Sequence, residues 1–204
     1  MKMGAKMIFK ISGGIVVALI LWYSFLTGEK LSFEETVFKH RDEILDFMKN
    51  NDESPLPDSV RTGFEGLDYF APDPSFKVEA ALELISDNSK LNTVTNDGQV
   101  RKYTRYAYAI FDLSGQQYQV TLLLDDTEKD GSLFLPFGDI TNGNSTYGGG
   151  RYLDLQLNKR NTIIIDFNLA YNPYCAYSAD YSCPLPPLEN QLSVAINAGE
   201  KNFN

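Results

Sequence analysis

The residues best suited to chemistry lie in the last third of the chain, between Leu133 and Lys201. They combine carboxylates, amides, hydroxyls and one guanidinium in segments that follow apolar runs. Glycines at 143 and 148–150 let the backbone between these segments take unusual angles. The pattern indicates a pocket for a small polar ligand or a cation. The candidate ligand-binding residues are Asp139, Thr141, Tyr147, Arg151, Asp166, Asn168 and Asn172.

Asp166 and Arg151 are the central pair of this set. Asp166 ends a strongly apolar run, where a carboxylate must be paired with a cation or carry a raised pKa. Arg151 is its natural partner, because a planar guanidinium can hold a carboxylate through two hydrogen bonds. Two interpretations stay open: a buried ion pair that fixes the register of the strands, or part of a ligand pocket.

Three functions fit these residues. The first is a binding domain, or a domain associated with the cell envelope. The second is a hydrolase that acts on an envelope glycan with Asp139 and Asp166 as acid and base. The third is a buried polar network that specifies the fold. A serine-type triad is disfavoured, because His40 is the sole histidine and precedes these residues by about a hundred positions. We expect binding or structure rather than catalysis, and no cofactor.

Cys175 and Cys183 are the only cysteines. Outside the cytoplasm two thiols this close in sequence usually form a disulfide, which contributes about 2 to 3 kcal/mol in the chain-entropy model. Zinc binding is not expected, because only two thiols are present and no histidine is near. The sequence therefore predicts a disulfide between Cys175 and Cys183.

The acidic segment 125–131 resembles a calcium-binding loop, because its carboxylates alternate and a glycine follows at the sixth position from Asp126. The twelfth position is Phe137 rather than the glutamate that supplies two ligands. A solvated acidic turn is therefore the favoured interpretation, and the sequence predicts no metal site.

The elements that must position these residues are strands. Apolar side chains recur at every second position from residue 76, and no helical pattern alternates with them. Ser114-Gly115 is a turn signal that predicts an antiparallel hairpin. The fold class is therefore mainly β, an antiparallel barrel or sandwich, in which the apolar segment 162–167 is expected to be central. The expected strands are 76–84, 100–113, 118–124, 133–137, 152–157 and 162–167.

One amphipathic helix precedes the strands. Ser32 and Glu35 have the spacing of a capping box, and apolar residues from Phe33 to Met48 form a stripe at helical spacing. We expect the helix from Phe33 to Lys49, followed by a loop over 50–57. His40 falls off the stripe and is expected to be solvated.

Residues 1–28 carry lysines followed by an apolar run, which is typical of a signal anchor or signal peptide. No cleavage pattern follows Leu26, so we expect a single transmembrane helix through residues 7–26. The lysines favour a cytoplasmic N-terminus, which places the rest of the chain on the periplasmic side of an inner membrane. Export after signal cleavage is the alternative.

The charge of the chain limits its partners. Of the 204 residues, those from Glu29 onward include 15 basic and 27 acidic side chains, a net charge of −12. Such a surface repels phosphate backbones, so we expect no nucleic acid partner.

The domain organisation follows from the same pattern of segments. We expect a helix and linker over residues 29–63, and residues 64–204 are long enough for one β-rich domain with its own core.

Several motifs closely resemble an uncharacterised prokaryotic family catalogued as domain of unknown function 1684. The matching runs are Phe-Gly-Asp-Ile-Thr-Asn-Gly at 137–143, Thr-Tyr-Gly-Gly-Gly-Arg-Tyr at 146–152, Asp-Phe-Asn-Leu-Ala-Tyr-Asn-Pro at 166–173, Cys-Pro-Leu-Pro-Pro at 183–187 and Ala-Gly-Glu-Lys at 198–201. The resemblance implies that these residues belong to one structural unit. It implies no reaction. Many members carry a longer N-terminal half, in whose place this chain has only the segment 32–62.

Overall fold

The computed structural model describes residues 31–125, 132–157 and 161–203. The chain divides into two compact units, Met1–Glu35 and Thr36–Asn204, and the second contains the β-sheet. The expected membrane span at residues 7–26 lies outside the described residues, as does nearly all of the acidic segment 125–131. Within the described ranges no helix is long and apolar enough to cross a membrane.

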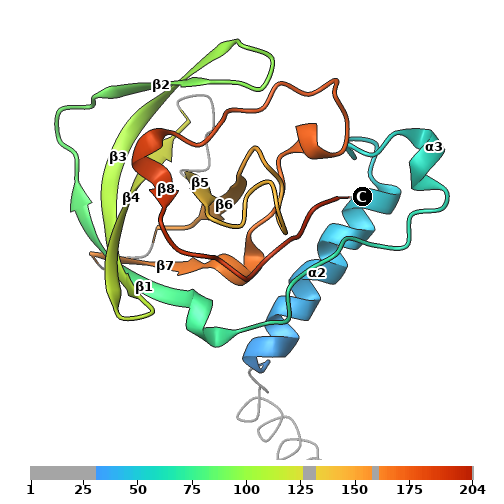
Figure 1. Ribbon diagram of the computed structural model, residues 1–204, viewed down its shortest axis with the longest axis horizontal. Coiled ribbons are helices and arrows are strands. Elements are labelled where there is room, and N and C mark those ends of the chain that lie inside the picture. Colours follow the sequence, from blue (N-terminus) through green and yellow to red (C-terminus); the bar gives the residue numbers. More distant parts are fainter. Residues whose placement is uncertain (1–30, 126–131, 158–160, 204) are drawn as a thin grey trace, which may run out of the picture. The chain divides into compact units, whose positions relative to one another are not determined.

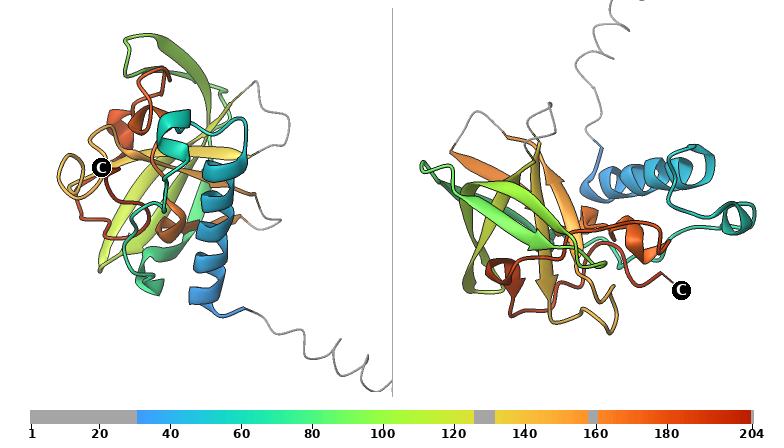
Figure 2. Two further views of the ribbon diagram at one scale, coloured as in Figure 1. Left: turned by 90° about the vertical axis from the view of Figure 1, so that its right-hand side faces the viewer. Right: turned by 90° about the horizontal axis from the view of Figure 1, so that it is seen from above.

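The second unit is mainly β, with one curled antiparallel sheet that forms an open half-barrel (Figures 1 and 2). The expected antiparallel architecture is confirmed, although the strands form a single curled sheet rather than two stacked ones. The main strand order is β6-β5-β4-β3-β1-β7. The strands are β1 (Lys77–Leu84), β2 (Lys90–Val94), β3 (Val100–Leu113), β4 (Gln116–Leu124), β5 (Leu133–Asp139), β6 (Arg151–Leu155), β7 (Thr162–Asp166) and β8 (Gln191–Leu192).

The long strand β3 organises the sheet. Its first part pairs with β2, its second part pairs with β1, and its other edge pairs with β4. The expected β3–β4 hairpin is confirmed. Ser114 and Gly115 both have positive φ, 54° and 79°, as a two-residue turn of type I′ requires. A bulge in β3 between Arg105 and Ala107 adds local twist.

Strand β7 was expected at the centre of the sheet but ends the strand order, where it pairs with β1. Ile163 and Ile165 are buried, whereas Ile164 is 44% exposed. The three isoleucines therefore follow the alternation of a strand with one covered face. The apolar composition predicted a strand correctly but not its place in the sheet.

Two hydrophobic clusters stabilise the second unit. The larger one lies on the inner face of the sheet and includes Phe111, Phe137 and Phe167. The smaller one contains Met48, Leu56, Phe64 and Tyr177, with apolar residues of helix α2 packed against it.

Helix α2 (Phe33–Asn50) confirms the expected amphipathic helix. Its capping box is formed: the Ser32 amide donates to Glu35 at 2.8 Å, and the Glu35 amide donates to Ser32 at 3.2 Å. The remaining helices of the described residues are short: α3 (Asp58–Arg61), η1 (Pro74–Phe76), η2 (Phe167–Leu169), η3 (Tyr174–Ala176) and η4 (Leu188–Asn190).

The final described residues, 196–203, form what we call the C-terminal strap. The Gly199 carbonyl accepts from Phe70 N at 3.0 Å, and Lys201 N donates to Asp68 O at 2.8 Å. Glu200 N donates to Ala170 O at 2.9 Å, beside the larger cluster. Phe203 packs in the smaller cluster. The strap therefore connects the two clusters.

Candidate functional site

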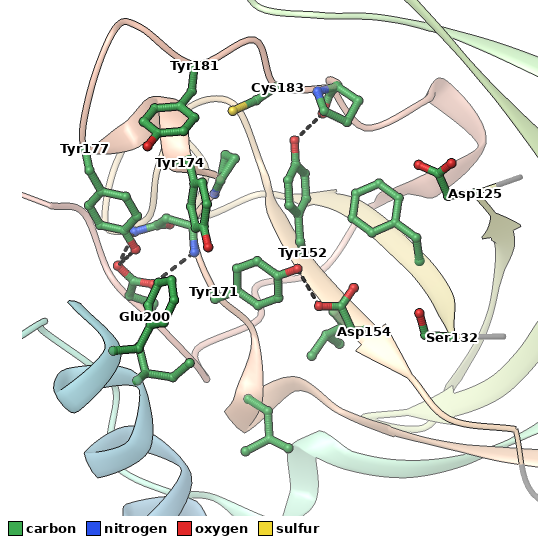
Figure 3. A pocket seen from close by; sticks show the side chains of 18 of the residues that line it. Asp125, Ser132, Tyr152, Asp154, Tyr171, Tyr174, Tyr177, Tyr181, Cys183 and Glu200 are labelled. Atoms are coloured by element: carbon green, nitrogen blue, oxygen red, sulfur yellow. Dashed lines mark hydrogen bonds between the residues drawn. The ribbon is translucent and has the colours of Figure 1, made fainter. Parts of the chain in front are cut away.

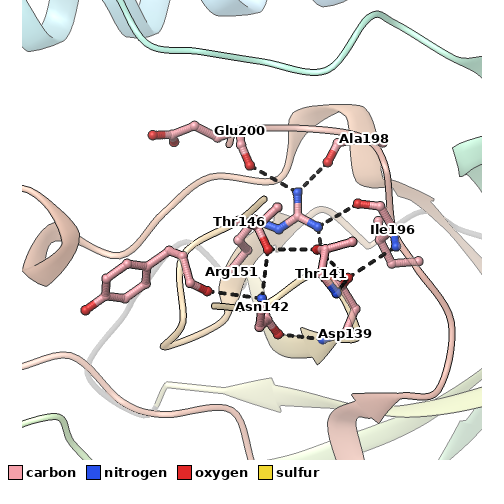
Figure 4. Close-up of polar contacts among 9 residues, drawn as sticks. Asp139, Thr141, Asn142, Thr146, Arg151, Ile196, Ala198 and Glu200 are labelled. Atoms are coloured by element: carbon pink, nitrogen blue, oxygen red, sulfur yellow. Dashed lines mark hydrogen bonds and ion pairs between the residues drawn. The ribbon is translucent and has the colours of Figure 1, made fainter. Parts of the chain in front are cut away.

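Arg151 lies at the start of β6 and is completely buried. Its Nη2 donates to Asp139 Oδ2 and to the Ile196 carbonyl, each at 2.9 Å. Its Nη1 donates to the carbonyls of Ala198 and Glu200 (Figure 4). Burial lowers the pKa of Arg151, and the adjacent Asp139 carboxylate opposes that effect. The guanidinium is thus enclosed by the C-terminal strap.

Asp139 is equally enclosed at the end of β5. Its Oδ1 accepts from the amide of Thr141 at 2.9 Å, from the hydroxyl of Thr141 at 2.6 Å and from Ile196 N at 3.2 Å. The Thr141 hydroxyl also contacts the Thr146 hydroxyl at 2.7 Å. Because these groups satisfy one another in the interior, we call Asp139, Thr141, Thr146 and Arg151 the buried arginine network.

The predicted pairing of Arg151 with Asp166 is wrong. Asp166 Oδ2 pairs with Lys77 Nζ at 3.2 Å, because Lys77 lies directly opposite Asp166 in the β1–β7 register. Asp166 Oδ1 accepts from the amide of Asn168 at 3.1 Å and from its side chain at 2.9 Å. Asp166 therefore caps the short helix η2 and belongs to a different cluster from Arg151.

The structure distributes the seven predicted site residues over several places. Asp139, Thr141 and Arg151 lie together in the buried arginine network, whereas Asp166 and Asn168 lie together at η2. The Tyr147 hydroxyl contacts Cys175 Sγ at 3.7 Å. Asn172 alone among the seven lines the large cleft described next.

A cleft of about 840 Å³ lies beside these clusters (Figure 3). Its volume is in the range of small-molecule sites. Six tyrosines from β3, β6 and the segment 171–181 line it, so we call it the tyrosine cleft. The lining also includes three carboxylates, Asp125, Asp154 and Glu200, together with Arg101 and with His40 on α2. The tyrosines are Tyr103, Tyr152, Tyr171, Tyr174, Tyr177 and Tyr181.

Hydrogen bonds fix three of these rings. The hydroxyl of Tyr152 donates to Pro184 O at 2.6 Å, that of Tyr171 to Asp154 Oδ2 at 2.7 Å, and that of Tyr177 to Glu200 Oε1 at 2.6 Å. Tyr174 and Tyr181 pack edge to face, with their ring centroids 5.2 Å apart. The wall is therefore largely preformed.

Glu200 is the most deeply buried carboxylate of the cleft, with 1% of its surface exposed. Its oxygens accept from the Asn172 amide at 2.9 Å, from Asn172 Nδ2 at 2.7 Å and from Tyr177. Burial raises the pKa of Glu200 to about 7, although these hydrogen bonds and Arg151 oppose the shift. Asn172 Oδ1 is buried and has no hydrogen-bond partner among the described residues.

His40 was expected to be solvated but is partly buried and lines the cleft. Burial lowers the pKa of His40, so the imidazole is mainly neutral at pH 7. His40 lies four residues, about one helical turn, before Ile44, which also lines the cleft, so the same side of α2 brings both residues there.

Cys175 and Cys183 are free thiols in this structure. The Cys175 amide donates to Cys183 Sγ at 3.0 Å, so the two residues lie side by side. The disulfide remains a prediction. Within the described ranges no group of three or more histidine, cysteine or carboxylate side chains is arranged to hold a metal ion.

Sequence reasoning missed the cleft, although a signal for it was present. Tyr171, Tyr174, Tyr177 and Tyr181 recur within eleven residues of a proline-containing segment. A short segment rich in half-buried aromatic residues is a reason to expect a wall of a binding site.

Comparison with known proteins agrees with the fold. The solution NMR structure of an uncharacterised protein from Haloarcula marismortui is similar, with a TM-score of 0.66 and 38% sequence identity. The match covers 81% of this chain and 92% of that one. No functionally curated protein matches the sequence. The model of the family described as a protein of unknown function (DUF1684) matches residues 62–201, which confirms the resemblance seen in the motifs. The chain therefore belongs to the DUF1684 family.

Proposed function

We propose that this protein is a membrane-tethered domain that binds a small polar ligand in the tyrosine cleft, on the outer side of the membrane. The observation that carries the binding role is the cleft itself: about 840 Å³ in volume, with an aromatic wall and polar groups that converge on it. Clefts of this composition are the usual location of ligand sites.

The contacts of the carboxylates favour binding over catalysis. Asp139 and Asp166, the pair considered for hydrolysis, are both buried and lie in separate clusters. Glu200 lines the cleft, but both of its oxygens already accept hydrogen bonds from Asn172 and Tyr177. A general acid must direct its proton at the substrate. Glu200 instead positions the cleft wall.

A ligand screen tests the binding role. We expect fragments of a polar library to shift the amide NMR signals of Asn172, Tyr174 and Tyr181 in the full chain. Gln156→Trp places a bulky ring at an exposed cleft position and should abolish these shifts. Gln117→Trp, at an exposed position of β4 outside the cleft lining, is the matched control and should leave them unchanged. Fragments that shift only signals elsewhere would argue against the cleft.

The tether is supported by residues 1–28 alone, with their lysines and apolar run. We expect the full chain to stay in the membrane fraction after alkaline carbonate extraction, and the chain without residues 1–28 to be released. External protease should digest the region after residue 28 in spheroplasts. Recovery of a chain shortened at its N-terminus from the soluble extracytoplasmic fraction would favour the cleaved signal peptide instead.

A further inference from the structure

The rings of the tyrosine cleft offer faces and edges more than free hydroxyls. Three of the hydroxyls donate to Pro184, Asp154 and Glu200. Tyrosine ring faces attract cations, and the attraction grows when the cation is shielded from water. The wall is therefore suited to a ligand with a positive charge on a small apolar body.

The charges around the cleft favour the same ligand. Asp125, Asp154 and Glu200 line it, and Arg101 is the one cationic lining residue in the described part of the chain, because His40 is mainly neutral. Arg101 is itself exposed and donates to the Ser182 carbonyl at 3.0 Å. These carboxylates belong to a stretch, residues 29–204, whose net charge is −12, and an acidic surface raises the local concentration of cations.

One buried atom in the wall lacks a hydrogen-bond donor. Asn172 has no exposed surface, and its Nδ2 donates to Glu200 Oε1 and to Lys201 O, each at 2.7 Å. These bonds fix the orientation of the amide, so its Oδ1 can only accept. That Oδ1 has no partner among the described residues. A buried acceptor without a donor is costly, and a ligand N–H would satisfy it.

From these observations we infer that the cleft binds a small organic ammonium ion that carries at least one N–H donor. This inference rests on the binding function proposed above. The aromatic faces contact the charged headgroup and its carbon chain, Asp154 and Glu200 balance the charge, and Asn172 accepts from the ammonium group. A metal ion fits less well, because within residues 31–125, 132–157 and 161–203 no cluster of metal-type ligands occurs.

A matched pair of probes tests whether binding requires a positive charge on the ligand. Calorimetric titration of the full chain at pH 8 with 1,4-diaminobutane should show binding, and 1,4-butanediol, which has the same length and no charge, should bind at least about tenfold more weakly. Tetramethylammonium, which has charge but no N–H, should fall between them.

Matched substitutions locate the effect. Asp154→Asn should weaken diamine binding about tenfold and leave the diol unchanged, whereas Asp112→Asn, an exposed position of β3 outside the cleft, removes the same charge and should have little effect. Tyr174→Leu should also weaken diamine binding, with Tyr108→Leu as its control. Thermal midpoints of all four variants verify that they are folded.

The outcomes separate the two proposals. Equal binding of diol and diamine, or binding of other fragments in the cleft without the diamine, would overturn the ammonium inference and leave the binding function intact. If no fragment and no diamine shifts a cleft signal, both proposals fail. If Asp154→Asn and Asp112→Asn weaken diamine binding equally, the diamine is attracted only to the acidic surface in general. That result would also overturn the inference.

Discussion

Arg151 has a side chain of a type that often binds ligands, but its hydrogen bonds are made within the fold. Its side chain is completely buried and donates to one carboxylate and three strap carbonyls. A guanidinium used in this way has no donor left for an outside ligand except Nε, which is buried without a partner. The geometry of Arg151 supports the interpretation that its cluster specifies the fold.

Arg151→Met should therefore destabilise the protein strongly. The substitution leaves the Asp139 carboxylate and three carbonyls buried without their donor, and the expected loss is about 3 to 5 kcal/mol. Denaturant unfolding of the full chain measures it. Lys39→Met removes a partner from the exposed Lys39–Glu43 pair and serves as control, with no measurable change expected. A loss below about 1 kcal/mol at Arg151 would contradict the structural role.

Glu200 gives the stability a specific pH dependence. Its pKa is raised from 4.5 to about 7 by burial beside Tyr177, Asn172 and Arg151, so the folded state binds this proton more tightly than the unfolded state. The stabilisation that protonated Glu200 gives the folded state is therefore fully present below about pH 4.5 and is lost as the pH rises through about 7. The shift corresponds to roughly 3 kcal/mol.

Comparing the parent with Glu200→Gln isolates this contribution. Between pH 4.5 and 8 the unfolding free energy of the parent should fall by roughly 3 kcal/mol more than that of the variant. Unfolding curves at several pH values measure the difference. Parallel curves for the two proteins would show that Glu200 does not titrate in this range.

At the scale of elements, the side chain of Asn190 replaces part of a strand ladder. The β4–β5 pairing is limited to Leu123 and Phe134, and β5 contains Pro136, which has no amide hydrogen to donate. Asn190 fills the gap: its Oδ1 accepts from Thr121 N at 2.7 Å, and its Nδ2 donates to the carbonyls of Thr121 and Pro136. Helix η4 thus joins two strands that barely pair.

Asn190→Leu should destabilise the protein, because it removes the hydrogen bonds that link β4 to β5. Three buried backbone groups would lose their partner, so we expect a loss of about 3 kcal/mol or more. Asn92→Leu, at an exposed position of β2, is the control and should change stability by less than about 0.5 kcal/mol. Amide exchange should also accelerate in β4 and β5 of the Asn190 variant. Unchanged exchange there would mean that β4 and β5 hold together without Asn190.

The strands and helix α2 could be predicted because their signals are local. Alternation of apolar residues marked β1, the Ser114-Gly115 turn marked the β3–β4 hairpin, a continuous apolar run marked β7, and Ser32 marked the start of α2. Strand β2 was missed because Thr93 is its only buried residue, so it carries almost no periodic signal. Non-local features could not be read: the partner of Asp166 depends on the β1–β7 register, and the tyrosine cleft assembles side chains from separate elements.

At the scale of the whole second unit, the C-terminal strap connects the two hydrophobic clusters. Gly199 shows how closely it is packed: its φ is +76°, and an added Cβ would lie 2.7 Å from the carbonyl oxygens of both Ala170 and Phe167. Only glycine fits this position without displacement of the backbone.

Gly199→Ala should therefore lower the free energy of unfolding by more than the positive φ alone explains. Gly143 has nearly the same φ, +74°, but open space around its Cβ position, so Gly143→Ala should cost only about 1 kcal/mol. The clash at Gly199 should raise the loss to about 3 kcal/mol. Thermal and denaturant unfolding of both variants measure the difference. Equal losses would show that the strap can shift without affecting the clusters.

The position of the strap also sets the order in which the unit can assemble. Arg151 and Asn172 have hydrogen-bond partners in residues 196–201. The polar contacts around these two residues are therefore incomplete until that segment is present. Contacts between residues distant in sequence form slowly, because the intervening chain must first be closed into a loop. A chain truncated after residue 190 should therefore remain protease-sensitive, whereas the chain with residues 191–204 should reach a protease-resistant native structure in one late step.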